Sequence, residues 1–258
     1  MKINLNADMG EGFGAYRIGH DNLLLKVVSS ANVASGFHAG DPWVMTETLA
    51  MAKAEGVSVG AHPSYPDLQG FGRRVMHIQP DELKAITLYQ IGALDGIARA
   101  AGLHVTHTKP HGALNNMACE DADIARAIAE AVRAYDPEMI LLAPVFSELA
   151  KAGQEAGLPV ALEVFADRAY TDAGHLLSRR QAGAVLHNPE DCVANVRRMV
   201  ERGGVVSIND RFLPTPFHSV CVHGDNELAA DNAAQVRRCL EELGCTVATL
   251  PGMRDQLG

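Results

Sequence analysis

Short apolar runs rich in β-branched residues alternate with longer helical patterns along the whole chain, and this alternation constrains the fold more than any other feature. Turn residues bound each short run, as they do around strands, and the longer segments have the length and the start signals of helices. The expected strands span residues 3–8, 31–36, 57–62, 105–109, 139–143, 160–165, 205–208 and 220–222. The expected helices span residues 41–55, 79–101, 121–134, 147–156, 189–202 and 228–243. Such an alternation is typical of βα units that build a parallel sheet.

Seven or eight such units in about 250 residues fit a β/α barrel, although an open doubly wound sheet has the same alternation. Polar residues at the carboxyl ends of nearly all the strands favour the barrel, because in a closed barrel these ends converge on one mouth. These strand-end residues are Asp8, His38, His62, Lys109, His111, Glu163, Asp167, Asp210, His223 and Asp225. We therefore predict an α/β fold, a TIM-like (β/α) barrel with eight strands or, if distorted, seven. It would form a single domain over residues 1–258.

The charge and the cysteine content exclude several classes of function. The chain has 22 Lys and Arg against 31 Asp and Glu, a net charge of −9, which disfavours binding to nucleic acid or to an anionic membrane surface. It has no signal-peptide pattern and no stretch of about 18 apolar residues to span a bilayer. Five widely spaced cysteines without a CxxC pair indicate neither a disulfide framework nor a cysteine zinc site. We expect a protein of the reducing cytoplasm.

Two carboxylates share the loop after the first predicted strand, in the segment NADMGE at residues 6–11. Asp8 ends the strand, and Glu11 follows a glycine that allows a tight turn. At a barrel mouth such a pair can bind a cation, or act as acid and base if their environments separate their pKa values. The simpler alternative is that Asp8 caps a turn and Glu11 is solvated.

Two neighbouring predicted strands each deliver a histidine at the same level, His38 in SGFHAGDP and His62 in GAHPSYPD. Each could act as a general acid or base, as a metal ligand, or as a hydrogen-bonded structural residue. No helical HExxH signature of zinc proteins is present, but aspartate and histidine at strand ends are also the parts of a hydrolytic metal site. The sequence therefore leaves the presence of a metal open.

The segment HTKPHGAL places His107, Lys109 and His111 at every second residue, so a continuing strand would point all three side chains the same way. Pro110 is expected to end the strand and to redirect His111. A lysine directed into a barrel should meet a carboxylate or an anionic substrate, because an unpaired buried charge is costly.

Arginines in two loops could hold a carboxylate or a phosphate, although solvated surface arginines are an equal alternative. Arg73 and Arg74 lie in GFGRR, and Arg168 follows Glu163 in a long connection that also carries the pair Arg179–Arg180. No GxxxxGK[ST] phosphate loop, GxGxxG turn or GxSxG nucleophile elbow occurs. The chain thus has no recognisable ATP or NAD site of its own, and its cysteines are poor candidates for a nucleophile.

A series of motifs in the expected order resembles the LamB/YcsF family, the A subunits of bacterial ATP-dependent 5-oxoprolinase. The motifs are NADMGEGFG, ANVASGFHAGDP, VGAHPSYPD with GFGRR, TKPHGALNN, EVFADRAYTDAG and VCVHGDN, and they extend from residue 6 to residue 226. The chain departs from the pattern at Ser35, where cysteine is expected, and at Asn115, where tyrosine is expected. The first departure argues against an essential thiol at that position, and neither affects the histidines and carboxylates.

The resemblance implies hydrolysis of 5-oxo-L-proline to L-glutamate coupled to cleavage of ATP to ADP and phosphate, in a complex with subunits B and C. It also implies a barrel related to polysaccharide deacetylases. ATP would be the cofactor, with a divalent metal such as Mg²⁺ accompanying it. Because amide resonance protects a lactam from hydrolysis, phosphorylation of the amide oxygen would make the ring a better electrophile.

On this reading Asp8, His38 or His62 activates water, while Lys109 and His111 stabilise developing negative charge. Arg73, Arg74 or Arg168 would hold the substrate carboxylate. The candidate catalytic residues are Asp8, Glu11, His38, His62, Lys109 and His111. The candidate substrate-binding residues are Asp41, Arg73, Arg74, Glu163, Arg168, His223 and Asp225.

Two other functions remain open at this point. A metal-dependent deacetylase or carbohydrate hydrolase could use the same strand-end aspartate and histidine residues. A non-catalytic subunit that only delivers 5-oxoproline to its partners would tolerate the loss of the acid and base residues.

Overall fold

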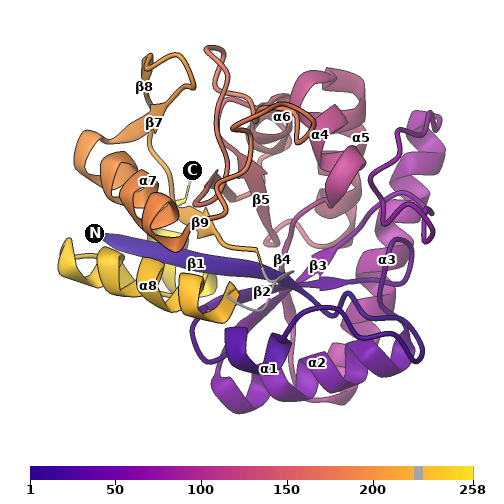
Figure 1. The fold of residues 1–258 in the computed structure, drawn as a ribbon. Coiled ribbons are helices and arrows are strands. Elements are labelled where there is room, and N and C mark those ends of the chain that lie inside the picture. Colours follow the sequence, from indigo (N-terminus) through magenta and orange to yellow (C-terminus); the bar gives the residue numbers. More distant parts are fainter. Residues whose placement is uncertain (224–228, 258) are drawn as a thin grey trace.

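Seven parallel strands close into a barrel in the computed structural model, which describes residues 1–223 and 229–257 (Figure 1). They are β1 (Lys2–Met9), β2 (Ser30–Ala34), β3 (Ser58–His62), β4 (Val105–Thr108), β5 (Ile140–Pro144), β6 (Val160–Phe165) and β9 (Ser219–Cys221). The strands pair in this order, and β9 closes the ring because it pairs with both β6 and β1. The predicted barrel is thereby confirmed in its seven-stranded form.

Helices surround the barrel on its outer side (Figure 1). They are α1 (Asp21–Leu24), α2 (Pro42–Glu55), α3 (Pro80–Ala100), α4 (Gly112–Glu120), α5 (Ala122–Tyr135), α6 (Glu148–Glu155), α7 (Pro189–Arg202) and α8 (Ala229–Glu242). The six predicted helices begin and end within one residue of the observed ones, apart from residue 228, which lies outside the described residues. The sequence predicted neither α1, which is a single turn, nor α4, which begins with glycine and contains two asparagines, all weak helix formers.

The strand predicted at residues 205–208 does not belong to the barrel. Its residues form β7 (Gly204–Val206), which pairs antiparallel with β8 (Phe212–Pro214) in a separate hairpin. Asp210 lies exposed in the turn of this hairpin with a φ of 61°. The expectation that it reaches the barrel mouth was therefore wrong. A run of β-branched residues signals a strand but not its partner, and the short polar segment after it favours a hairpin.

The last elements of the chain lie beside the amino-terminal end of β1. β10 (Thr246–Val247) pairs in parallel with the first residues of β1, and the 3₁₀ helix η1 (Pro251–Gln256) follows it. None of the described helices has the length and the apolar content that crossing a membrane requires.

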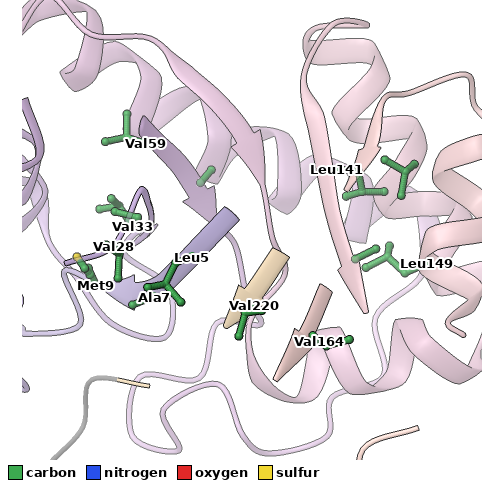
Figure 2. Close-up of a cluster of buried hydrophobic side chains, with 14 of the residues drawn as sticks. Leu5, Ala7, Met9, Val28, Val33, Val59, Leu141, Leu149, Val164 and Val220 are labelled. Carbon is green, nitrogen blue, oxygen red and sulfur yellow. The ribbon is translucent and has the colours of Figure 1, made fainter. Parts of the chain in front are cut away.

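The main hydrophobic core lies between the strands and the helices, and a second, smaller cluster on the other face of β5 and β6 consists of Ile140, Leu142, Ala161 and Leu250. Figure 2 shows part of the main core, in which strand residues such as Val164 and Val220 belong to one cluster with Leu149 of α6. The residues of β1 in this cluster are Ile3, Leu5, Ala7 and Met9. Because side chains alternate along a strand, the intervening residues Asn4, Asn6 and Asp8 face the inside of the barrel.

The polar side chains on this inner face form hydrogen bonds with one another. Asn6 Nδ2 donates to Glu163 Oε1 and to Ser219 Oγ, each at 2.8 Å. Asn32 Nδ2 donates to Asn6 Oδ1 at 2.7 Å, and the Asn32 Oδ1 atom lies 3.1 Å from His107 Nε2. Buried polar groups cost little when they are paired in this way.

Gly60 of β3 tests how tightly this interior is packed. A Cβ atom at Gly60 would lie 2.2 Å from the His107 ring, which is held by Thr106 and Asn32. We expect Gly60→Ala to lower the free energy of unfolding by about 1–3 kcal/mol, the usual cost of overpacking. Urea denaturation measures this change.

Gly96 in α3 provides the matched control, because a Cβ there meets nothing within 4 Å. Gly96→Ala should raise stability by about 0.5–1 kcal/mol through helix propensity alone. Equal effects of the two substitutions would contradict a tightly packed interior.

Candidate active site

The carboxyl ends of the barrel strands open into a cavity of about 640 Å³. Its lining includes, among other candidate residues, Asp8, Glu11, His62, Lys109, His111 and Arg168. These side chains come from β1, β3, β4 and β6 and from the loops that follow them. The mouth of the barrel thus brings together residues that are up to 160 positions apart in the chain.

Three histidines and one carboxylate form a cluster at this cavity. The His62 Nε2 and His111 Nδ1 atoms lie 3.1 Å apart, and the Glu11 Oε1 atom lies 3.7 Å from both His111 Nδ1 and His38 Nε2. The rings of His38 and His111 stack with centroids 3.9 Å apart. We call Glu11, His38, His62 and His111 the histidine cluster.

The loop of the GFGRR motif packs directly on this cluster. Gly72 has a φ of +64°, and a Cβ there would lie 2.8 Å from both His111 Cδ2 and His38 Cβ. The Phe71 carbonyl accepts a hydrogen bond from His111 Nε2 at 2.9 Å. Only glycine allows this close approach, so the motif positions His111 through its backbone rather than through its arginines.

Asp8 lies between the histidine cluster and the barrel interior. Its Oδ2 atom is 3.3 Å from His62 Nε2, and its Oδ1 atom accepts hydrogen bonds from Asn32 Nδ2 at 2.8 Å and from Lys109 Nζ at 3.1 Å. Burial alone would raise the pKa of Asp8, but the charges of His62 and Lys109 outweigh it and hold that pKa well below its usual range. Asp8 is therefore an ionised carboxylate that faces the cavity.

At the neighbouring groups, burial outweighs the nearby charges and determines the direction of the pKa shift. It raises the pKa of Glu11, which the nearby His111 opposes only in part. It also lowers the pKa of His38 and of His111 well below their usual range, so both imidazoles are neutral at pH 7. The two carboxylates of the NADMGE loop thus have pKa values shifted in opposite directions.

Lys109 extends into the barrel interior. Its Nζ atom lies 3.1 Å from Asp8 Oδ1 and 3.1 Å from Glu163 Oε1, which confirms that this buried lysine meets carboxylates. Nζ also lies 3.3 Å from Asn6 Oδ1 and 3.2 Å from Cys221 Sγ. An ammonium group has three N–H donors, so these acceptors leave Lys109 none for a substrate.

Four of the substrate-binding candidates lie at the cavity or in the barrel interior. Arg73, Arg168 and His223 line the cavity, and Arg168 is buried and donates to the backbone carbonyls of Leu177 and Ala184. Glu163 lies deeper, fully buried, and its Oε2 atom has no hydrogen-bond partner among the residues that the structure describes.

Asp41 and Arg74 are not brought to the cavity. The Asp41 carboxylate caps α2 by accepting from the backbone N–H groups of Trp43 and Val44, and Arg74 forms an ion pair with Asp67. Local partners satisfy both side chains, which explains why their place in the motifs did not predict their position. Asp225 lies in residues 224–228, outside the described residues.

Sequence reasoning missed the asparagines that hold the site. Asn6 and Asn32 support Asp8 and Lys109 from within the barrel. The polar residues at positions 4, 6 and 8, which alternate with apolar ones, were the signal that could have found Asn6.

A comparison with known proteins gives consistent results. Residues 3–255 match the model of the LamB/YcsF family. The A subunit of 5-oxoprolinase from Azoarcus sp. (strain BH72) is 56% identical over 98% of this chain and 99% of its own length. The crystal structure of a lactam utilization protein from Thermus thermophilus superposes with a TM-score of 0.91 at 44% identity, covering 97% of this chain and all of that one.

A more distant likeness concerns the fold alone. The T48 deacetylase, solved with its substrate, is 14% identical and has a TM-score of 0.52 over all of this chain and 92% of that one. The barrel is thus shared with a deacetylase, as expected.

A further ion pair, between His223 and Asp167, should make the stability of the protein depend on pH. His223 Nδ1 lies 2.8 Å from Asp167 Oδ2. Burial would raise the pKa of Asp167 and lower that of His223, but their mutual attraction outweighs burial in both cases, so Asp167 titrates below its usual range and His223 above it. Asp167 then stabilises the fold above pH about 3.9, and His223 does so below pH about 6.5.

We expect Asp167→Asn to lower stability most near pH 5.5, by about 1.5–3 kcal/mol, the usual value of a hydrogen bond to a charged group. The loss should shrink as the pH rises through the raised pKa of His223. Melting temperatures of wild type and variant from pH 5 to pH 9 measure this dependence. A loss that grows toward alkaline pH would contradict the assignment.

Proposed function

The chain belongs to the LamB/YcsF family, and from this premise we propose that it acts as the A subunit of a 5-oxoprolinase. In this role it takes part in the hydrolysis of 5-oxo-L-proline to L-glutamate, coupled to cleavage of ATP, together with subunits B and C. The observation that carries the proposal is the position of the Asp8 carboxylate, which lines an open cavity with its Oδ2 atom 3.3 Å from His62 Nε2.

Asp8 is the general base in this proposal. Lys109 and Asn32 hold its Oδ1 atom, so that the Oδ2 atom remains on the side of His62 and the cavity. A water molecule at this position would lose a proton to Asp8 as it attacks the ring carbon. The His62 Nδ1 atom donates to the Lys109 carbonyl at 2.6 Å, which fixes the orientation of the imidazole next to this carboxylate.

Lys109 takes a different role from the one expected from the sequence. Because its donors are used by Asp8, Glu163 and Asn6, it maintains the charge and the orientation of Asp8 rather than stabilising an oxyanion. We propose it as a positioning residue.

The substrate carboxylate would meet cationic side chains on the cavity wall. Arg73 and Arg168 line the cavity, and a guanidinium group can hold a carboxylate with two hydrogen bonds. A monoanionic lactam therefore fits a site that has a base at its floor and arginines on its wall. We propose Arg73 and Arg168 for this contact and leave Arg74 to its ion pair with Asp67.

In this reaction ATP phosphorylates the amide oxygen, which makes the ring carbon a better electrophile for water; the C–N bond then breaks with a proton going to nitrogen, and a second water releases the phosphate from the resulting acyl phosphate. The chain has no GxxxxGK[ST] phosphate loop, so we propose that subunits B and C contribute to nucleotide binding. The part assigned to this chain is the addition of water to the activated ring carbon, followed by cleavage of the C–N bond with transfer of a proton to the leaving nitrogen.

Metal-dependent deacetylation is the second candidate, because the histidine cluster could hold a metal ion beside Asp8. Delivery of 5-oxoproline without catalysis is the third. The three functions differ in what they require of Asp8 and of the partner subunits.

Reconstitution distinguishes these candidates. We expect glutamate release from 5-oxoproline and ATP only when this chain is combined with its subunits B and C, and not from the chain or from B and C alone. Glutamate measured by a coupled dehydrogenase assay reports the outcome. No release from any combination of folded subunits, together with release of acetate from an acetylated sugar, would replace the proposal with the deacetylase.

Asp8→Asn tests the base in the reconstituted complex. We expect the turnover number to fall by about 10²–10⁴-fold, the usual contribution of a general base, with the complex still assembled. Asp123→Asn, at an exposed position at the start of α5, is the matched control and should keep full activity. Full activity of Asp8→Asn would instead support substrate delivery without catalysis.

A further inference from the structure

The tautomers of two histidines in the cluster are set by backbone carbonyls. A carbonyl oxygen only accepts hydrogen bonds, so the ring nitrogen that faces it carries the proton. His62 Nδ1 faces the Lys109 carbonyl at 2.6 Å, and His111 Nε2 faces the Phe71 carbonyl at 2.9 Å. The other nitrogen of each ring, His62 Nε2 and His111 Nδ1, therefore presents a lone pair when the ring is neutral.

These two lone pairs face each other across 3.1 Å. Two acceptors at that distance repel one another unless a proton or a cation lies between them. Three further groups adjoin them, and the Oδ2 atom of the first, Asp8, lies 3.3 Å from His62 Nε2. The Glu11 Oε1 atom lies 3.7 Å from His111 Nδ1, and His38, fully buried, has no hydrogen-bond partner for either ring nitrogen among the residues that the structure describes.

The spacing of these atoms fits one metal ion. Ligand atoms bound at 2.0–2.1 Å to a tetrahedral metal lie about 3.3 Å from one another. The separations in the cluster lie on either side of this value. They are 3.1 Å for His62–His111, 3.7 Å for Glu11–His111 and 3.7 Å for Glu11–His38. All four ligand atoms lie within 4.8 Å of one another.

The surroundings also match those of metal-bound histidines. A histidine that binds a metal almost always donates its other ring N–H to a carbonyl or a carboxylate, which fixes the tautomer. His62 and His111 both do so, through the Lys109 and Phe71 carbonyls.

From these observations we propose that Glu11, His38, His62 and His111 form a binding site for one divalent first-row transition metal ion, with Zn²⁺ as the expected occupant. A donor set of three imidazoles and one carboxylate suits Zn²⁺ and Co²⁺ better than Mg²⁺, which prefers oxygen ligands. This site goes beyond the proposed function and is separate from any Mg²⁺ that accompanies ATP. It lies next to Asp8 and the cavity, where a metal ion can polarise a carbonyl oxygen.

Direct metal loading tests the site without any turnover. The full chain is stripped with a chelator and dialysed against Zn²⁺, and bound zinc is measured by mass spectrometry. We expect one zinc ion per chain. Co²⁺ in place of Zn²⁺ should give the visible absorption bands of a tetrahedral Co²⁺ site, and the addition of Zn²⁺ should abolish them.

Two variants assign the ligands. Glu11→Gln preserves the shape of the side chain and should weaken Zn²⁺ binding by at least about 10-fold, while His111→Gln should weaken it by about 100-fold or more, since even loss of an outer contact costs 10–100-fold. His104→Gln, at an exposed histidine before β4, is the matched control and should bind as wild type does. Circular dichroism of each variant verifies that it is folded.

Less than about 0.1 zinc per folded chain would overturn the proposal and leave a shared proton between His62 and His111 in place of the metal. Unchanged zinc binding by both Glu11→Gln and His111→Gln would overturn it as well, because the ion would then lie elsewhere. Neither 5-oxoproline nor ATP is present in these measurements. A failure here is therefore distinguishable from a failure of the reconstituted reaction.

Discussion

The ion pairs of Lys109 with Asp8 and Glu163 are the interaction on which the rest of this structure depends. A buried ammonium requires partners, and here the partners come from β1 and β6. Asn6 bridges the same groups to Ser219 of β9, the strand that closes the ring. Closure of the barrel and ionisation of Asp8 are thus maintained by one network, so the geometry of the site cannot change independently of the barrel.

The sequence predicted most of the fold because local patterns determine it. Helix caps such as Asp41 and positive-φ glycines such as Gly56 mark helix ends within one residue, and β-branched runs mark the barrel strands. It failed where the partner of a strand had to be identified. Residues 205–208 have the composition of a buried strand, but the turn at Asp210 pairs them with β8 instead of with a barrel neighbour.

The candidate site was predicted in part for a related reason. The strand-end positions of Asp8, His62, Lys109 and His111 became neighbours because all strands of a closed parallel barrel end on one side. Arg74 and Asp41 share the same motifs, yet nearby partners hold them elsewhere. Membership in a motif does not show whether a side chain pairs with groups nearby in the chain or extends into the cavity. Burial and hydrogen-bond geometry, which require the structure, make that distinction.

The pairing of β1 with β9 also determines when the protein can complete its fold during synthesis. Asn6 and Ser219, which form a hydrogen bond across this junction, are 213 residues apart in the chain. Contacts of such long sequence separation form late. β1 is synthesised before the other barrel strands and lacks its final neighbour until β9 has been made. The inner face of β1 carries Asn4, Asn6 and Asp8 in place of apolar residues. Until β9 pairs with β1, these polar side chains keep this face of the strand hydrated and less prone to aggregate.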